Sequence, residues 1–394
     1  MLYTKYIYNY HLLFLVCFTL PMYIRLNSII LGLFIILSII TSFNKNHKSK
    51  PYFLKVYIPV LVFFALALIG SLIGEDPSYF KSLEKYWSFL LVPIAFWLIN
   101  LNSIKLKHYA FYGLITGCIA TLLICYINAI YEIIAYQEPI SYFLRWRHLS
   151  HRFTLIADTH PAYLGLFICT STFYLLFNAK KLNNILKIII LVFFFFGMLQ
   201  LASRLALFIF LIIFLIYILS LFKTNLKFAI VGTLIVSIAS ILYFSKGSYY
   251  LNQRLLSSES VTSDSRFERL DVYFEIFDEN LLFGTGLKSI DKIRINKYKQ
   301  YNQSLAADKN YNAHNQFVEY LALNGIVGGI VYMGVFIYLI MMSIKDRNYL
   351  FIFIITAFFV ANLTESMLVR IKGIEYFSVF ISLFLKNRFI KKST

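Results

Sequence analysis

Residues 188–220 read IIILVFFFFGMLQLASRLALFIFLIIFLIYILS, and Arg204 is the single charged side chain in this stretch. An apolar run of about 20 residues is long enough to cross the hydrocarbon core of a bilayer as a helix. The stretch therefore predicts two successive membrane spans that meet at Ser203 and Arg204. Helices are expected, because the strands of a membrane barrel would alternate polar and apolar residues.

The composition of the whole chain is that of a membrane protein. Of its 394 residues, 59% are hydrophobic and 14% are charged, and the mean hydropathy is +0.70. These values exclude a soluble domain of this length. No soluble basic domain carries the formal charge of +18, so we expect membrane lipids as partners and no nucleic acid. The cysteines fall within apolar runs and are expected to be core residues: Cys17, Cys118, Cys125 and Cys169.

Hydropathy predicts an all-α polytopic fold of about twelve spans in a single integral membrane domain over residues 1–394. The spans are expected near 8–23, 27–43, 53–73, 86–101, 109–134, 160–177, 187–202, 204–222, 227–244, 316–342, 348–363 and 373–386. Every short loop on one side carries Lys or Arg, which marks that side as cytoplasmic. Both termini are then cytoplasmic, and residues 245–315 form a long loop on the outer, periplasmic side. This loop breaks the symmetry expected of many transporters.

The long outer loop contains a predicted amphipathic helix near 266–282. Its apolar side chains recur in steps of three and four: Phe267, Leu270, Phe274, Phe277 and Leu281. Ser265 and Glu268 fit a capping box at its start, and Gly284 with Gly286 supplies a stop.

Arg266 and Arg269 lie in the first turns of this helix, on one side. Exposed backbone N–H groups and guanidinium forks together favour a phosphate, so the pair is a candidate diphosphate clamp. A surface helix on anionic lipid headgroups would explain the same residues. Arg204, at the outer junction of two spans, is a further candidate, and its alternative is snorkelling to lipid phosphate.

His314 precedes the apolar run that begins at Phe317, which predicts an imidazole at the outer mouth of the tenth span. A neutral imidazole can accept a proton from a sugar hydroxyl, so His314 is a candidate general base. The alternative is a polar helix terminus. Gly325 and Gly329 form a small-xxx-small pair and are expected to serve helix packing.

A second outward cluster of basic residues lies between the fifth and sixth predicted spans. It comprises Arg145, Arg147, Arg152 and His160, together with His151. An anionic lipid diphosphate would account for positive charge on the outer side, and lipid headgroups are the alternative.

Neither a metal nor a cofactor is expected, because no dense group of carboxylates and histidines appears in the outer loops. Glu75 and Asp76 form an acidic pair in one outer loop. This pair leaves open a mechanism in which a carboxylate or metal ion assists transfer from a polyprenyl-monophosphate sugar.

Several of these features resemble the O-antigen ligase and O-antigen polymerase superfamily of bacterial membrane glycosyltransferases. The likeness is carried by Ser203-Arg204, by Arg266-Phe-Glu-Arg with Asn280-Leu-Leu-Phe-Gly284-Thr-Gly286, and by His314-Asn315-Gln-Phe-Val-Glu-Tyr with Asn324-Gly325-Ile-Val-Gly328. His160-Pro161-Ala-Tyr163-Leu is also similar to the start of the sixth span in some members.

The resemblance implies a glycosyltransferase in the bacterial inner membrane whose active site is periplasmic. Its donor would be an undecaprenyl-diphosphate-linked glycan, held by Arg204 and Arg266, with Arg269 as the alternative loop arginine, and His314 would act as base. An O-antigen ligase would use lipid A-core as acceptor, an O-antigen polymerase would use another lipid-linked repeat unit, and a protein O-glycosylation enzyme would use a protein. A flippase or exporter of lipid-linked glycans is the alternative of another class.

Overall fold

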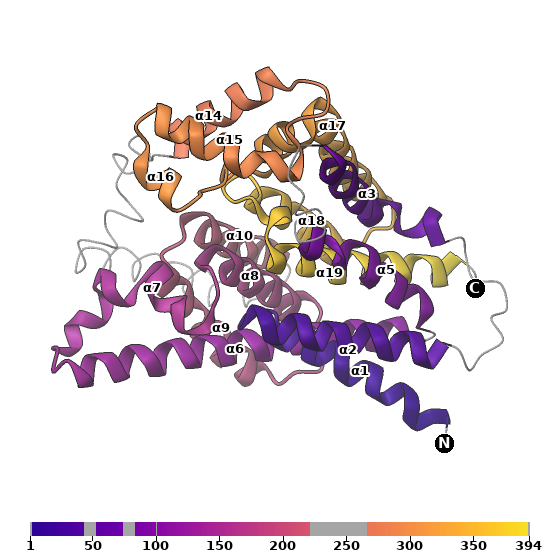
Figure 1. Cartoon of the computed structure of the whole chain (residues 1–394). Helices are drawn as coiled ribbons and strands as arrows, with labels where there is room; N and C mark the ends of the chain where they lie inside the picture. Colours follow the sequence, from indigo (N-terminus) through magenta and orange to yellow (C-terminus); the bar gives the residue numbers. More distant parts are fainter. Residues whose placement is uncertain (1, 43–52, 74–82, 100, 221–265, 393–394) are drawn as a thin grey trace. The chain divides into compact units, whose positions relative to one another are not determined.

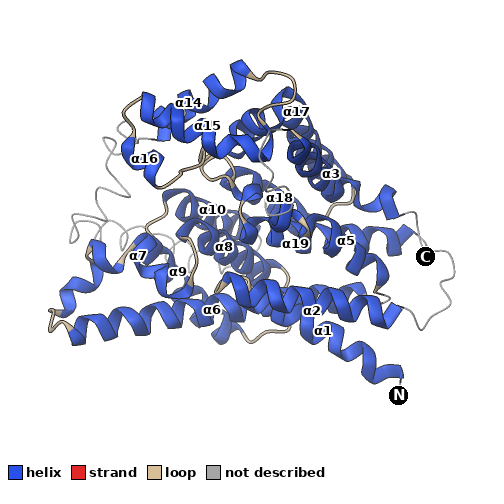
Figure 2. Cartoon of the chain, viewed as in Figure 1, coloured by secondary structure: helices blue, strands red, loops and turns tan. Residues whose placement is uncertain are grey.

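The computed structural model describes residues 2–42, 53–73, 83–99, 101–220 and 266–392. Every regular element within these ranges is a helix, and no strand occurs among them (Figure 2). This agrees with the predicted all-α class.

Each predicted span within the described ranges overlaps a helix, whereas the span near 227–244 lies outside them. The helices are α1 (Leu2–Thr19), α2 (Ile24–Ser42), α3 (Phe53–Leu72), α5 (Ser88–Leu98), α6 (Ser103–Ala135), α8 (Pro161–Phe177), α9 (Asn184–Leu201), α10 (Arg204–Ser220), α17 (Gln316–Lys345), α18 (Tyr349–Ala361) and α19 (Ile371–Lys392). Among the residues that the structure describes, five helices are long and apolar enough to cross a membrane, or six if a bent pair counts as one span. The number of about twelve spans therefore stays a prediction.

The remaining helices lie between these segments. They are η1 (Glu84–Tyr86), η2 (Ile140–Leu144), η3 (Trp146–His148), α7 (Ser150–Thr154), η4 (Leu155–Ala157), α14 (Arg266–Glu279), α15 (Gly286–Gln300), α16 (Ser304–Asp308) and η5 (Met367–Val369). In Figure 1, α14, α15 and α16 lie close together and are drawn in orange.

The chain forms two compact units. The first comprises Met1–Leu13, Ile29–Tyr109 and Asp264–Thr394, and the second comprises Phe14–Ser28 and Ala110–Ser263. The boundary passes through α1, α2 and α6, so these helices contribute to both units.

The membrane helices of the first unit pack through aromatic side chains. α19 contacts α5 and α3, and α17 contacts α18 and α3. Phe377 of α19 is buried at the centre. Its ring lies 5.4 Å from that of Phe63 in α3, 5.9 Å from Phe336 in α17 and 5.4 Å from Phe358 in α18, measured between centroids. One side chain of α19 thus joins α17 and α18 to α3, which lies far from them in the sequence.

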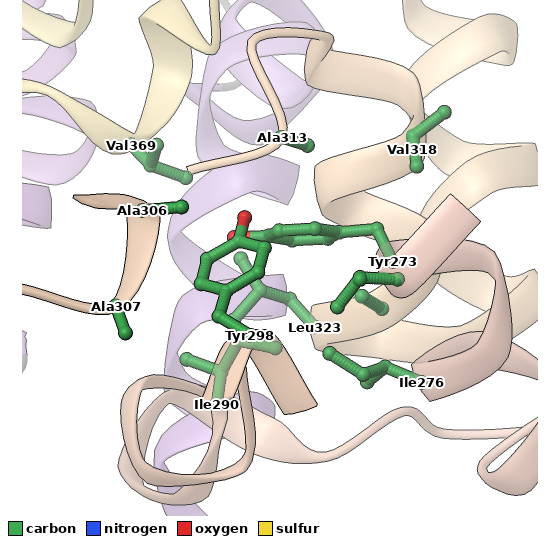
Figure 3. Packing of buried hydrophobic residues seen from close by; sticks show 12 residues of the cluster. Tyr273, Ile276, Ile290, Tyr298, Ala306, Ala307, Ala313, Val318, Leu323 and Val369 are labelled. Carbon is green, nitrogen blue, oxygen red and sulfur yellow. The ribbon is translucent and has the colours of Figure 1, made fainter. Parts of the chain in front are cut away.

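The orange helices share a hydrophobic core with the first part of α17 and with Val369, all within the first unit. Tyr273 of α14 and Tyr298 of α15 are fully buried in the middle of this cluster, as Figure 3 shows. Lys297 of α15 reaches across to α14, where its Nζ lies 2.8 Å from a carboxylate oxygen of Glu275 and 2.8 Å from one of Glu279. Apolar packing and this ion pair hold α14 against α15.

The predicted amphipathic helix exists but is shorter, since α14 ends at Glu279. The buried face comprises Arg269, Val272, Tyr273 and Ile276. Phe267, Phe274 and Leu281 of the predicted apolar stripe are exposed. Ser265 of the predicted capping box lies outside the described residues. α14 therefore packs through a mixed face, which a count of apolar spacings alone does not identify.

α17 is interrupted at Gly325, whose φ of 64° and ψ of −160° are not helical. In a straight helix Phe317 and Tyr332 would lie about 22 Å apart, yet their ring centroids are 6.3 Å apart. Gly329 likewise faces Leu321 and Phe317 closely. The helix therefore folds back on itself, with one arm before Gly325 and one after it. The predicted span 316–342 is corrected accordingly, because it is not one continuous helix.

In the second unit, α8 packs against α9 and α10. Gly113 and Gly117 of α6 allow close approach, because a Cβ at either position would meet the backbone carbonyl oxygen of Phe14 or Phe18 at 2.3 or 2.2 Å. The segment 150–157 is bent by 79° relative to α8. All four cysteines are buried and free, in agreement with the prediction that they are core residues.

Candidate functional site

Glu365 links two of the predicted site residues within the first unit. Its Oε2 lies 3.1 Å from Nδ1 of His314, and its Oε1 lies 3.5 Å from Nη2 of Arg266. The side chain of Glu365 is 9% exposed, that of His314 17% and that of Arg266 34%. The carboxylate is thus buried between an imidazole and a guanidinium that remain open to solvent or a ligand.

The backbone around His314 holds this residue in a fixed conformation at the start of α17. Its backbone has a φ of 51°, a left-handed conformation that costs energy for a residue other than glycine and is often found at functional sites. Its N–H donates to Oδ1 of Asn312 at 3.2 Å. Asn315 caps α17 by accepting from the N–H groups of Phe317 and Val318 at 3.0 and 3.2 Å.

The segment that carries Glu365 is tied to the same helix start. The N–H of Gln316 donates to the carbonyl of Asn362 at 2.8 Å, and Asn315 Nδ2 donates to the carbonyl of Leu363 at 3.3 Å. These bonds join the end of α18 to the start of α17. The separation between His314 and Glu365 is therefore fixed by the backbone rather than by the two side chains alone.

The arrangement can perform general base chemistry. When Nδ1 of His314 donates its proton to the carboxylate of Glu365, Nε2 is left unprotonated and can accept a proton. The carboxylate also stabilises the imidazolium that then forms.

Arg266 and Arg269 have different environments, although both lie on α14. Arg266 begins the helix and donates through Nη1 to the carbonyl of Thr364 at 3.3 Å. Arg269 is buried, and its guanidinium lies over the ring of Tyr311 at 5.3 Å. Glu365 contacts Arg266, and the choice between Arg266 and Arg269 as the donor-binding arginine stays a prediction.

Arg204 belongs to the second unit and is the first residue of α10. It follows a tight turn in which Ala202 caps α9 with a φ of 47°. Its side chain is half-buried. The prediction that Arg204 shares a site with His314 stays a prediction.

Three of the basic residues predicted between the fifth and sixth spans surround a pocket of about 300 Å³ in the second unit. The pocket is lined by Glu138, Tyr142, Arg145, Trp146, Arg147, His148 and Arg152. Each arginine lies over an aromatic ring: Arg145 over Tyr142 at 3.2 Å, Arg147 over Tyr136 at 4.6 Å and Arg152 over Trp146 at 3.9 Å. His160 does not line it. Instead, Nδ1 of His160 accepts from the N–H of Ala162 at 3.3 Å and caps α8.

A second polar network lies behind the His314 segment. Oε2 of Glu319 accepts from the N–H of Ala313 at 2.9 Å, and Tyr273 donates to Oε1 at 3.4 Å. Arg294 Nη1 donates to the hydroxyl of Tyr273 at 3.0 Å. Burial and the charge of Glu319 raise the pKa of Tyr273 well above its usual value. Burial opposes the charge of Arg294, but Tyr273, Glu319 and Asp291 raise its pKa overall, so it stays cationic.

Glu365 and Glu319 are not among the site residues predicted from the sequence. Glu365 is the single charged residue between Tyr349 and Val369, and a lone carboxylate in such an apolar stretch could have marked it as a candidate. Among the residues described, no three His, Cys, Asp or Glu side chains gather as a metal site would require. Glu75 and Asp76 lie outside the described residues.

Comparison with known proteins gives one family. Residues 189–333 match the family model described as O-Antigen ligase. No curated protein matches the chain. The matched range includes Arg204, Arg266 and His314, whereas Glu365 lies beyond it. Residues 189–333 are therefore similar to the O-antigen ligase family, in agreement with the resemblance predicted from the sequence.

Proposed function

We propose that this protein is a membrane glycosyltransferase that moves a glycan from undecaprenyl diphosphate to the lipid A-core on the periplasmic side of the inner membrane. The family match supports a reaction of the O-antigen ligase or polymerase type. The observation that carries the proposal is the contact of one buried carboxylate, that of Glu365, with both His314 and Arg266.

In the proposed reaction, Nε2 of His314 accepts the proton of an acceptor hydroxyl. The oxygen attacks the anomeric carbon of the donor glycan, and the bond from that carbon to the diphosphate breaks. The leaving diphosphate takes the electron pair. This single displacement inverts the anomeric carbon and needs no nucleotide, since the diphosphate linkage already stores the driving force. Glu365 orients the imidazole and stabilises its protonated form.

Arg266 stabilises the negative charge that grows on the diphosphate as the sugar leaves. A guanidinium in a partly buried position acts more strongly on such charge than one in bulk water. Its exposed fraction of 34% leaves it accessible to a ligand. The topology predicted from loop charges puts Arg204 on the outer side of the membrane as well, and we propose that it acts on the same diphosphate. The arginines of the 300 Å³ pocket, Arg145, Arg147 and Arg152, would assist in binding anionic substrate.

The direct test is transfer by purified protein in liposomes that contain labelled donor and acceptor. His314→Ala, Arg204→Ala and Arg266→Ala should each lose most transfer at equal protein amounts. His11→Ala and Arg25→Ala change an exposed histidine and an exposed arginine elsewhere, so both should transfer normally. Normal transfer by all three site variants would refute the proposed site. Movement of donor across the bilayer without a new glycosidic bond would indicate a flippase instead.

Glycan analysis of a deletion strain separates the ligase from the polymerase. If the protein is a ligase, the deletion strain should contain lipid A-core without polymer and should accumulate lipid-linked polymer. Single repeat units that remain on lipid A-core would indicate a polymerase. Normal lipopolysaccharide together with loss of a glycoprotein would indicate protein O-glycosylation.

A further inference from the structure

A second cavity of the first unit, of about 390 Å³, adjoins the segment that carries His314. It lies between α15, η1, the start of α17 and the residues after η5. Its lining is Lys85, Tyr86, Leu287, Ile290, Asp291, Arg294, Lys309, Asn310, Asn312, Glu319, Leu323, Val369 and Arg370. Ile290, Leu323 and Val369, labelled in Figure 3, form part of its apolar wall.

The lining has an excess of positive charge. It contains four basic side chains and two carboxylates, a difference of two. Arg294 forms ion pairs with both carboxylates. Its Nη2 lies 2.7 Å from Asp291 Oδ1, and its Nη1 lies 3.8 Å from Glu319 Oε1. Within the described residues, Lys85, Lys309 and Arg370 form no ion pair. These three cations are therefore available to an anion.

Lys85 is the cation that an anion would affect most. Burial lowers its pKa, and the nearby charges of Arg370 and Arg294 lower it further, while Glu319 and Asp291 raise it. Lys85 is half-buried, and an ammonium partly removed from water without an ion pair is costly, so a bound anion offsets that cost. The cavity thus gains from an anionic occupant.

The size and the remaining lining limit what the occupant can be. Ligand pockets commonly measure about 300–1,000 Å³, so this one suits a small group. Asn310 and Asn312 offer amide groups for hydroxyls, and Tyr86 with Leu287 offers apolar contact. A combination of amides, an aromatic ring and cations matches an acidic monosaccharide better than a bare phosphate or a lipid chain.

The cavity is connected to the candidate site through Glu319. Its Oε2 accepts from the N–H of Ala313, next to His314, and from Oγ of Ser366 at 3.2 Å, next to Glu365. The lining itself contains neither Arg266 nor Glu365. The cavity is therefore beside the proposed donor-diphosphate site and distinct from it.

We propose that this cavity binds an acidic sugar of the acceptor glycan, one that carries a phosphate or carboxylate, through Lys85, Lys309 and Arg370. The inference rests on the proposed function, because it assumes that an acceptor glycan reaches His314. It adds that the enzyme selects acceptors by their negative charge.

Binding and transfer are measured separately. Isothermal titration of the purified protein uses glucose 6-phosphate and glucuronate as probes and glucose as the neutral control. Lys309→Gln and Arg370→Gln should weaken binding of both acidic probes by about 10- to 100-fold, as loss of a charged hydrogen bond would. Glucose should bind equally to all proteins. Lys292→Gln is the matched control, since Lys292 is an exposed residue of α15 outside the lining. Lys309 and Arg370 are also exposed, so these substitutions should leave folding intact.

Transfer kinetics with acidic and matched neutral acceptors complete the test. The two variants should raise KM for the acidic acceptor by a similar factor, with unchanged kcat and unchanged KM for the donor. Unchanged binding and KM would overturn the inference while transfer by the wild type still supports the proposed function. A raised KM for the donor alone would also overturn it and assign the cavity to the diphosphate. If the wild type binds the probes but transfers nothing, the proposed function fails, and the acceptor assignment falls with it.

Discussion

At the scale of single residues, the position of Glu365 explains how His314 can serve as a base. A histidine that accepts a proton becomes positively charged, and a carboxylate 3.1 Å from Nδ1 stabilises that charge. The same carboxylate contacts Arg266, so it also holds the proposed donor-binding arginine near the base. Glu365 acts through these two side chains and is a positioning residue.

We expect Glu365→Gln to lower kcat for transfer by about 10²- to 10⁴-fold, because an amide cannot stabilise the imidazolium. The KM values for donor and acceptor should change little, and Glu365→Asp should restore part of the rate. Steady-state kinetics in liposomes would measure this. Glu268→Gln, at an exposed glutamate of α14, is the control. A wild-type kcat in Glu365→Gln would show that the carboxylate does not support the base.

The two arginines of α14 should respond differently to substitution. Arg266→Ala should reduce kcat by about 10²- to 10³-fold without loss of folded protein, because the side chain is partly exposed. Arg266→Lys should recover part of the rate if the role is mainly Coulombic. Arg269→Ala should instead lower the unfolding temperature, since its buried guanidinium packs on Tyr311. Kinetics and thermal unfolding of the same preparations test this contrast, and the opposite pattern would assign the diphosphate to Arg269.

His314 and Arg204 could be proposed from the sequence because each lies beside a long apolar run, and Arg266 because it begins a predicted amphipathic helix. Glu365 could not be paired with His314 in the same way. The two residues are separated by about 50 positions, and their contact depends on hydrogen bonds between the ends of α17 and α18. Spacing along the chain carries no information about such a contact. A lone carboxylate in an apolar stretch indicates a candidate functional residue, but it does not identify the residue that the carboxylate contacts.

At the scale of elements, the reversal of α17 at Gly325 is the main departure from the hydropathy prediction. The arm after Gly325 spans 326–345, and at 1.5 Å per residue it is about 30 Å long, which matches a hydrocarbon core. The arm before it carries Glu319 and follows His314 directly. Hydropathy cannot detect the break, because both arms are apolar.

We expect Gly325→Ala to destabilise the protein strongly. Its φ of 64° with ψ of −160° lies in a region that is essentially restricted to glycine, at a cost of about 1–3 kcal/mol for other residues. An added Cβ would also meet the carbonyl carbon and oxygen of Leu282 at 2.3 Å. Gly334→Ala is the matched control on the same helix, since a Cβ there has no atom within 4 Å.

Thermal unfolding of the two variants in detergent would test this reversal. Gly325→Ala should lower the unfolding temperature and the folded yield, whereas Gly334→Ala should leave them equal or slightly raised. Equal stability of the two variants would argue against a turn at Gly325.

The sequence prediction that Gly325 and Gly329 serve helix packing was incomplete, because Gly325 forms the turn between the two arms of α17. Gly329 does make close contacts, but with Phe317 and Leu321 of the preceding arm.

At the scale of the whole molecule, the distribution of charge among the loops predicts one orientation in the membrane. The range that matches the family, 189–333, contains the candidate donor-binding residues Arg204, Arg266 and Arg269 and the candidate base His314. Lys345 and Arg347 mark the opposite, cytoplasmic side in the topology predicted from the sequence. The helical class could be predicted because long apolar runs cross a membrane as helices. The boundaries of the spans could not, because they depend on helix breaks that only the structure shows.

The orientation can be tested with single cysteines in a background in which Cys17, Cys118, Cys125 and Cys169 are replaced by alanine. Gln300 at the end of α15 and Lys345 at the end of α17 are both exposed, but the predicted topology places them on opposite sides. In intact spheroplasts, a membrane-impermeant maleimide should label Gln300→Cys. It should label Lys345→Cys only after the membrane is permeabilised. Labelling of Lys345→Cys from outside, with Gln300→Cys protected, would reverse the orientation and place His314 on the cytoplasmic side. A periplasmic glycan donor could then not reach it.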